Sequence, residues 1–298
     1  MKRISIGSWS FSLGPFSNNP VPWTELLSRL KQLGYDGIEV AGFSIHPRPE
    51  NQPTKEDRER IKQEAATIGI EFPSYIPDLW CERIIDTDDP SGYLRAFRRG
   101  LEFAADIGAK ALCIDTLARP GIFREVDYET AVTRLSTVWK RCAKEAADYG
   151  LYIGWEFEPV YAFNKPSEVI RIVEEVNEDN FGIAFDTCLA EMIGRYGFGQ
   201  FGTEEILHDG CIEYARRLRG KINHIHLMDC DGIVHLDGKS NQRSLGEGSI
   251  DLKAALAELN SPENKAAWLV IDPGLPDDPW GMAEKCRKYL AQSLQTVV

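Results

Sequence analysis

Hydrophobic and polar positions follow one another along the chain in a repeating order: an amphipathic segment, a glycine, and a short apolar run. The first full example covers residues 23–40. Four leucines between Trp23 and Leu33 recur at helical spacing, Gly34 ends the segment, and residues 37–40 (GIEV) are almost entirely apolar. This order predicts a helix that is followed by a buried strand.

The same order recurs over the whole length. It predicts strands at residues 4–9, 37–40, 70–76, 110–115, 151–159, 181–186, 222–229 and 268–272, and helices at 23–33, 54–68, 90–107, 128–149, 167–176, 203–218, 252–259 and 279–294. Eight apolar strands, each followed by a helix, suit a parallel barrel that is covered on its outside. We therefore predict an α/β fold, a (β/α)8 TIM barrel.

One domain over residues 1–298 is expected, because no Pro/Gly/Ser-rich linker divides the chain. A doubly wound open sheet is the competing fold. It is disfavoured because no Gly-x-Gly-x-x-Gly turn follows the first strand, as a dinucleotide-binding fold would require.

Charge and composition narrow the classes of function. The net charge of −12, without a basic stripe, opposes binding to nucleic acid. The start, MKRISIGSWSF, lacks the apolar core of a signal peptide, and no later run is long enough to span a membrane, so a cytoplasmic protein with no membrane partner is expected. Seven cysteines without CxxC spacing predict reduced thiols.

Four polar residues fall at the ends of consecutive predicted strands: Glu156, Asp186, His226 and Asp272. In a barrel of this kind these ends meet at one rim, where the chemistry takes place. Three carboxylates and one imidazole form an oxygen-rich set that suits Mn²⁺ or Mg²⁺, with Co²⁺ or Zn²⁺ as further options. We predict a divalent metal site, with Mn²⁺ favoured, and no organic cofactor.

Each of these residues alone has a simpler interpretation. Asp186 or Asp272 would then cap a helix, His226 would be a hydrogen-bonded core histidine, and Glu156 would pair with an arginine. Four such coincidences on successive strands favour one shared metal.

Several segments resemble the xylose-isomerase-like sugar phosphate isomerase/epimerase barrels, which include ketose 3-epimerases, inosose-processing enzymes and endonucleases of the endonuclease IV type. These segments are YGLYIGWEF (149–157), NFGIAFDT (180–187), HIHLMD (224–229), LGEGSIDL (245–252) and LVIDP (269–273). The resemblance implies the four metal ligands named above, and its spacing from Gly150 selects Glu156 rather than Glu158. It also implies a small-molecule sugar substrate and a homo-oligomer, either a dimer or a tetramer.

Two positions depart from the family pattern. Asp272 stands where the family usually has a glutamate, which has one more methylene, so the metal must shift or a water must bridge. The family often has Asp-Thr-x-His after the sixth strand, whereas this chain has Leu189 at the histidine position. Both departures lie on the side of the site that handles substrate.

The resemblance implies that Glu156 and Asp272 act as the catalytic base and acid on an enediolate intermediate. The leading hypothesis is a metal-dependent isomerase or epimerase that acts on a keto-sugar or polyol derivative. Two alternatives remain: a lyase or dehydratase that eliminates from a 3-keto sugar, and a barrel that binds sugar without turnover. DNA repair is disfavoured by the negative charge and by a total of only five histidines.

Further residues near the predicted strand ends are candidates for substrate binding: Glu158, His46, Trp9, Tyr75, Asp115, Glu39 and Glu247. For each, a structural role remains open: the acidic residues can cap helices, the aromatic ones can pack, and His46 can be an ordinary loop residue. No glycine-rich phosphate cradle follows the last two strands, which favours an unphosphorylated substrate.

Overall fold

Eight parallel strands close into a barrel in the computed structural model, which describes residues 2–235 and 240–294. Around the barrel the strands follow the order β1, β10, β7, β6, β5, β4, β3, β2. Their bounds are Arg3–Gly7 (β1), Gly37–Ala41 (β2), Ser74–Ile76 (β3), Ala111–Ile114 (β4), Tyr152–Glu156 (β5), Phe181–Asp186 (β6), Ile222–Leu227 (β7) and Trp268–Ile271 (β10). The predicted TIM barrel is confirmed.

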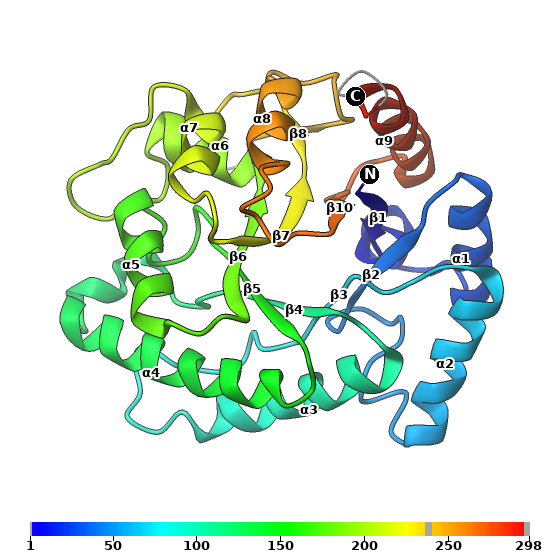
Figure 1. Cartoon of the computed structure of the whole chain (residues 1–298), viewed down its shortest axis with the longest axis horizontal. Helices are drawn as coiled ribbons and strands as arrows, with labels where there is room; N and C mark the ends of the chain where they lie inside the picture. Colours follow the sequence, from blue (N-terminus) through cyan, green and yellow to red (C-terminus); the bar gives the residue numbers. More distant parts are fainter. Residues whose placement is uncertain (1, 236–239, 295–298) are drawn as a thin grey trace.

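Helices form a ring around the strands (Figure 1). They are Trp23–Gln32 (α1), Lys55–Ile68 (α2), Ser91–Ile107 (α3), Tyr128–Ala147 (α4), Pro166–Val176 (α5), Thr187–Tyr196 (α6), Gly210–Arg217 (α7), Leu252–Leu259 (α8) and Pro279–Ser293 (α9), with short 3-10 helices at Trp9–Phe11, Gly14–Phe16 and Pro120–Arg124. Glycines in the left-handed conformation end several of them. Gly69 and Gly108, for example, have φ angles of 82° and 85°.

Several predicted elements differ in extent, and the strands expected at 4–9, 151–159 and 222–229 end earlier, at Gly7, Glu156 and Leu227. The strand expected at 70–76 begins only at Ser74, because Pro73 lacks the amide hydrogen that a ladder needs. The helix expected at 203–218 is the shorter α7, and α6, which follows β6 directly, was not predicted. The sequence signal for α6 is Asp186, a good N-cap residue directly before it.

Along each barrel strand the side chains alternate between the helices and the barrel interior. On β5, Trp155 packs outward against Trp139 of α4, with ring centroids 5.1 Å apart. Glu156 is the next residue, so it points inward. This alternation brings polar residues from several strands into one interior space at the end where the strands terminate.

A hairpin over this end was not predicted. It consists of two short strands, Asp229–Cys230 (β8) and Gln242–Arg243 (β9). The buried carboxylate of Asp229 accepts hydrogen bonds from the amides of Cys230, Gly246, Gly248 and Ile250. The segments HIHLMD and LGEGSIDL are therefore joined through one aspartate.

Within the described part of the chain, no helix is both long enough and apolar enough to cross a membrane. The single domain, the cytoplasmic location and the oligomeric state stay predictions.

Candidate metal centre

Three of the four predicted metal ligands lie together at the ends of adjacent strands. Glu156 ends β5, Asp186 ends β6 and His226 lies near the end of β7, where it pairs in register with Asp186. One ligand atom from each of the three lies within 4.8 Å of the others. Parallel strands of neighbouring register bring these residues to one level of the barrel.

The imidazole of His226 is held between two carboxylates. Its Nδ1 lies 2.6 Å from Oε1 of Glu156, and its Nε2 lies 2.9 Å from Oε2 of Glu39. Burial lowers the pKa of His226, but Glu39 and Glu156 outweigh that effect and raise it well above the usual value. Metal-binding histidines characteristically use one nitrogen for the metal and the other for a carboxylate. In His226 the contact of Nε2 with Glu39 would be the carboxylate contact, and Nδ1, beside Glu156, would face the metal.

Asp186 combines both roles that the sequence left open. Its Oδ1 accepts a hydrogen bond of 2.7 Å from the amide of Leu189, so it caps α6. Its Oδ2 is buried and has no hydrogen-bond partner. A buried carboxylate oxygen without a partner is costly, and a cation bound beside it would remove that cost.

Asp272 directly follows β10. Its Oδ1 accepts a hydrogen bond of 2.7 Å from the amide of Gly274, and it is not part of the group within 4.8 Å. Burial raises the pKa of Asp272 to about 7, His226 opposes this rise, and Glu156 adds to it. The short side chain thus leaves Asp272 near the other ligands without joining them.

Negative charge accumulates at this end of the barrel. Asp115, which follows β4, and Glu158, which follows β5, also face Glu156: burial and the Glu156 charge raise the pKa of Asp115 to about 7 and that of Glu158 well above its ordinary value. Burial and the charges of Asp272 and Glu156 likewise raise the pKa of Asp186. Among the described residues, no lysine or arginine forms an ion pair with any of these five carboxylates. The donor set therefore fits a divalent cation.

Glu39 is fully buried in the barrel interior, on the side of His226 away from Glu156. Its carboxylate faces Nε2 of His224 at 3.0 Å as well as His226, and it accepts hydrogen bonds from Ser74 and, at 3.5 Å, from Cys113. Burial would raise the pKa of Glu39, but the two histidines hold it well below the usual value. Glu39 therefore orients His226. A glutamate inside the apolar GIEV run was the available sequence signal for this role.

We expect the substitution Glu39→Gln to weaken Mn²⁺ binding by roughly 10- to 100-fold, the range typical of residues that orient metal ligands. Glutamine keeps the shape but loses the charge that fixes the His226 ring. Isothermal titration of Mn²⁺ measures the effect, and circular dichroism checks that the variant folds. Glu71→Gln, at an exposed glutamate paired with Arg3, is the control and should bind as the wild type does. If Glu39→Gln binds Mn²⁺ with wild-type affinity, Glu39 does not orient His226 for metal binding.

Trp9 reaches the site from the loop after β1. A Cβ atom placed on Gly7 would lie only 2.2 Å from two carbons of the Trp9 indole, so the ring lies against this glycine at the end of β1. Trp9 itself is 8% exposed. Of the candidates for substrate binding, Trp9, Asp115 and Glu158 therefore lie around the mouth.

Three other candidates contact different partners. Tyr75 points outward to Phe103, with centroids 5.0 Å apart, because its strand neighbour Ser74 faces the interior. Glu247 is exposed and pairs with Lys285 of α9 at 2.9 Å. The structure therefore does not bring Tyr75 or Glu247 to the metal ligands.

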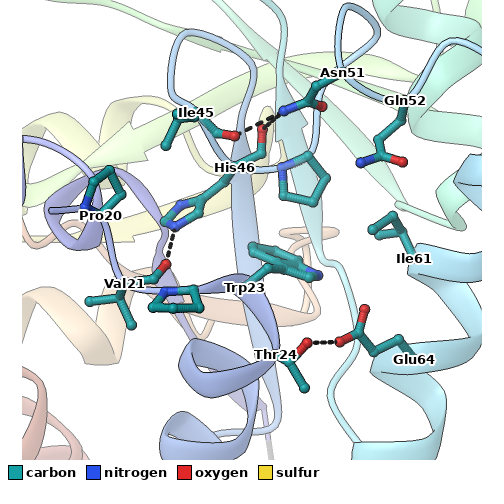
Figure 2. A pocket seen from close by; sticks show the side chains of 12 residues that line it. Pro20, Val21, Trp23, Thr24, Ile45, His46, Asn51, Gln52, Ile61 and Glu64 are labelled. Atoms are coloured by element: carbon teal, nitrogen blue, oxygen red, sulfur yellow. Dashed lines mark hydrogen bonds between the residues drawn. The ribbon is translucent and has the colours of Figure 1, made fainter.

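His46 lines a cavity of about 450 Å³ between the loop after β2 and the helices α1 and α2. Its Nε2 lies 3.1 Å from the carbonyl oxygen of Val21, and its ring lies near that of Trp23, as Figure 2 shows. Burial lowers the pKa of His46. The ring thus has its contacts in this cavity rather than with the metal ligands.

A closed parallel barrel with carboxylates and an imidazole converging at its C-terminal rim defines a TIM-barrel protein with a candidate metal centre. A family model described as the xylose isomerase-like TIM barrel matches residues 27–277, and the chain belongs to that family. The family resemblance inferred from the sequence segments is confirmed.

Similar proteins include an inosose dehydratase and an L-ribulose 3-epimerase. Inosose dehydratase of Glaesserella parasuis serovar 5 (strain SH0165) is 23% identical over 296 residues, covering 90% of this chain and 89% of the relative. The structure of an L-ribulose 3-epimerase superposes with a TM-score of 0.74 at 17% identity, covering 99% of this chain and 95% of that one. The IOLI protein, solved with a bound zinc atom, gives a TM-score of 0.70 at 19% identity, covering 99% and 98%. The chain thus resembles these proteins over nearly its whole length.

Proposed function

We propose that this protein is a divalent-metal-dependent isomerase or epimerase that acts on a keto-sugar or polyol derivative. It would remove a proton from the carbon next to the carbonyl group and then return a proton, so that the product is an isomer or epimer of the substrate. The observation that carries this proposal is the convergence of Glu156, Asp186 and His226 beside three further carboxylates, Asp115, Glu158 and Asp272, none of which pairs with a lysine or arginine in the described part of the chain. The keto-sugar substrate is inferred from the sugar enzymes among its relatives.

The cation would be held by Glu156, Asp186 and His226, with Asp272 as the fourth carboxylate. The oxygen-rich donor set favours Mn²⁺. When bound, a cation here supplies positive charge that stabilises the negative oxygens of an enediolate.

Glu156 and Asp272 are the proposed proton carriers. One carboxylate takes the proton from the carbon next to the carbonyl group, and the electrons of the broken C–H bond move onto the carbonyl oxygen. The other carboxylate returns a proton, either to the opposite face of the same carbon or to the neighbouring carbon. Glu158 and Asp115 are proposed to bind sugar hydroxyl groups.

Dehydration is the second candidate, and the inosose dehydratase relatives favour it. The first step is the same, but the enolate then expels the hydroxyl group from the β-carbon. That group leaves with its bonding electron pair, takes a proton and becomes water, while a carbon–carbon double bond forms. Asp272, whose pKa burial raises to about 7, would supply that proton, and Glu156 would keep the proton taken from carbon.

The experiment is incubation of the Mn²⁺-loaded protein in D₂O with free ketoses, an inosose and 3-keto glycosides. We expect deuterium to enter at the carbon next to the carbonyl group, to stop on chelation with EDTA and to return with Mn²⁺. Retained substrate mass apart from deuterium identifies isomerisation or epimerisation, and loss of water identifies dehydration. Stoichiometric metal without exchange in any of these compounds would instead support a barrel that binds sugar without turnover.

A further inference from the structure

Three aromatic side chains form a cluster of their own at the mouth of the barrel. They are Trp9, Phe43 and Trp80, from the loops after β1, β2 and β3, and we refer to them as the aromatic ladder. The ring centroids of Trp9 and Phe43 lie 6.2 Å apart, and Phe43 stacks on Trp80 at 4.6 Å with an angle of 19° between the rings. None of the three belongs to the contiguous hydrophobic core of the barrel. Core packing therefore does not account for their arrangement.

The inner end of the ladder borders the candidate metal centre. In the strand register Gly7 pairs with Glu39, and the residue before Gly7 pairs with Ile271, so Gly7 is level with both Glu39 and Asp272. Glu39 points into the barrel, so the space beside Gly7 is interior too. The Trp9 indole fills that space. Trp9 thus forms part of the wall next to Asp272.

The outer end of the ladder opens to solvent. Trp80 is 56% exposed, whereas Trp9 is 8% exposed. Indole rings carry a large apolar area that is usually buried, and Phe43 covers only one face of Trp80. The ladder therefore runs from a nearly buried ring beside the end of β1 to an exposed ring.

We propose that the ladder is a second substrate subsite, which binds the aromatic aglycone of a glycoside while its keto-sugar ring lies at the metal ligands. This inference rests on the proposed function and names the substrate class for that same site. The ladder spans two ring-to-ring separations, so it offers more surface than a single sugar ring needs. Its inner ring adjoins the space where the reacting carbons of the sugar would lie.

The electrostatics of the mouth favour an uncharged second ring. Five carboxylates face this space, and the whole chain carries a net charge of −12. A phosphate attached to the sugar would be repelled there. Phe43, the middle ring, has no hydrogen-bonding group, so it suits a ring without hydroxyl groups better than a second sugar. Aromatic rings gain additional stabilisation when they stack in an offset or tilted arrangement.

The test compares two glycosides that differ only in the aglycone. Phenyl β-D-glucopyranoside and methyl β-D-glucopyranoside are titrated calorimetrically into the Mn²⁺-loaded protein, so that binding is measured without turnover. We expect the phenyl glycoside to bind about tenfold more tightly, which corresponds to one stacked aromatic pair. Trp80→Ala should abolish this preference and leave the affinity for the methyl glycoside unchanged.

Tyr152→Ala is the matched control. Tyr152 is 42% exposed, but it lies at the start of β5, at the opposite end of the barrel. This variant should keep the full preference for the phenyl glycoside. Both substitutions remove an exposed aromatic ring. If only Trp80→Ala loses the preference for the phenyl glycoside, the preference depends on the position of Trp80 and not on a general loss of aromatic surface.

Equal affinity for the two glycosides, an unchanged preference in Trp80→Ala, or failure of both glycosides to bind would overturn the subsite. Cellobiose binding that depends on Trp80, with no preference for phenyl over methyl, would overturn the aromatic assignment and indicate a second sugar ring. None of these results affects the proposed function, because deuterium exchange into free ketoses or an inosose is measured without any aglycone.

Discussion

Glu156→Gln is expected to lower the rate of solvent deuterium exchange into substrate by about 10³-fold or more, because the substitution removes both a metal ligand and a proton carrier. Glutamine has the size of glutamate but cannot accept a proton at neutral pH. In the structure Oε1 of Glu156 lies 2.6 Å from Nδ1 of His226, so the variant also loses the negative charge that pairs with the imidazole. The measurement is the exchange rate in D₂O at saturating Mn²⁺, with bound metal determined in parallel.

Glu158→Gln is the control for this prediction. Glu158 lies two residues further along and shares the negative environment of Glu156. We expect this variant to keep its metal, since Glu158 is not in the ligand group, even where its substrate affinity falls. If Glu156→Gln retained both metal and exchange, or if Glu158→Gln lost the metal instead, Glu156 would not be the ligand and base.

The barrel was predictable because it depends on local patterns. Helical spacing of leucines, glycines at helix ends and short apolar runs are properties of neighbouring residues, and eight repeats leave few arrangements besides a closed parallel barrel. Strand ends were predictable for the same reason, so Glu156, Asp186 and His226 could be placed together in advance. The missed helix α6 shows the limit, because one residue, Asp186, serves both as cap and as candidate ligand.

The remaining features of the site depend on contacts between distant segments. The bonds of Glu39 to His224 and His226 join β2 to β7, and no spacing in the sequence indicates that these strands face each other across the interior. Tyr75 points outward because its neighbour Ser74 faces the interior, and the sequence does not indicate which of the two does so. The position of Trp9 depends on the missing side chain of Gly7, which makes room for the indole.

The role of Asp272 also depends on the three-dimensional arrangement. Its side chain lacks one methylene relative to the usual glutamate and already binds the amide of Gly274. Gln242 of the β9 strand donates to the backbone carbonyl of Asp272 at 2.8 Å, so the hairpin fixes this segment as well. An acid held in this way can transfer a proton without contributing to the core of the ligand set. In the proposed mechanism the three residues on β5 to β7 would hold the cation, and Asp272 would act on the substrate.

Asp186→Asn is expected to abolish Mn²⁺ binding and activity while leaving the metal-free fold intact. Asparagine caps helices about as well as aspartate, so its oxygen can still accept the amide hydrogen of Leu189 and hold α6. Its amide group, however, replaces the buried Oδ2 that has no partner, and an NH₂ group cannot bind a cation. The free energy of unfolding without metal should stay within about 0.5 kcal/mol of the wild type, or rise, because one of several repelling carboxylates is removed. Added Mn²⁺ at a hundred times its dissociation constant should stabilise the wild type by about 2.7 kcal/mol and the variant not at all.

Asp251→Asn, at the aspartate that caps α8 through Ala254, is the matched control and should keep the full stabilisation by Mn²⁺. Loss of the fold in metal-free Asp186→Asn would mean that the charge at Asp186 serves the helix cap. Unchanged stabilisation by Mn²⁺ would mean that the cation lies elsewhere.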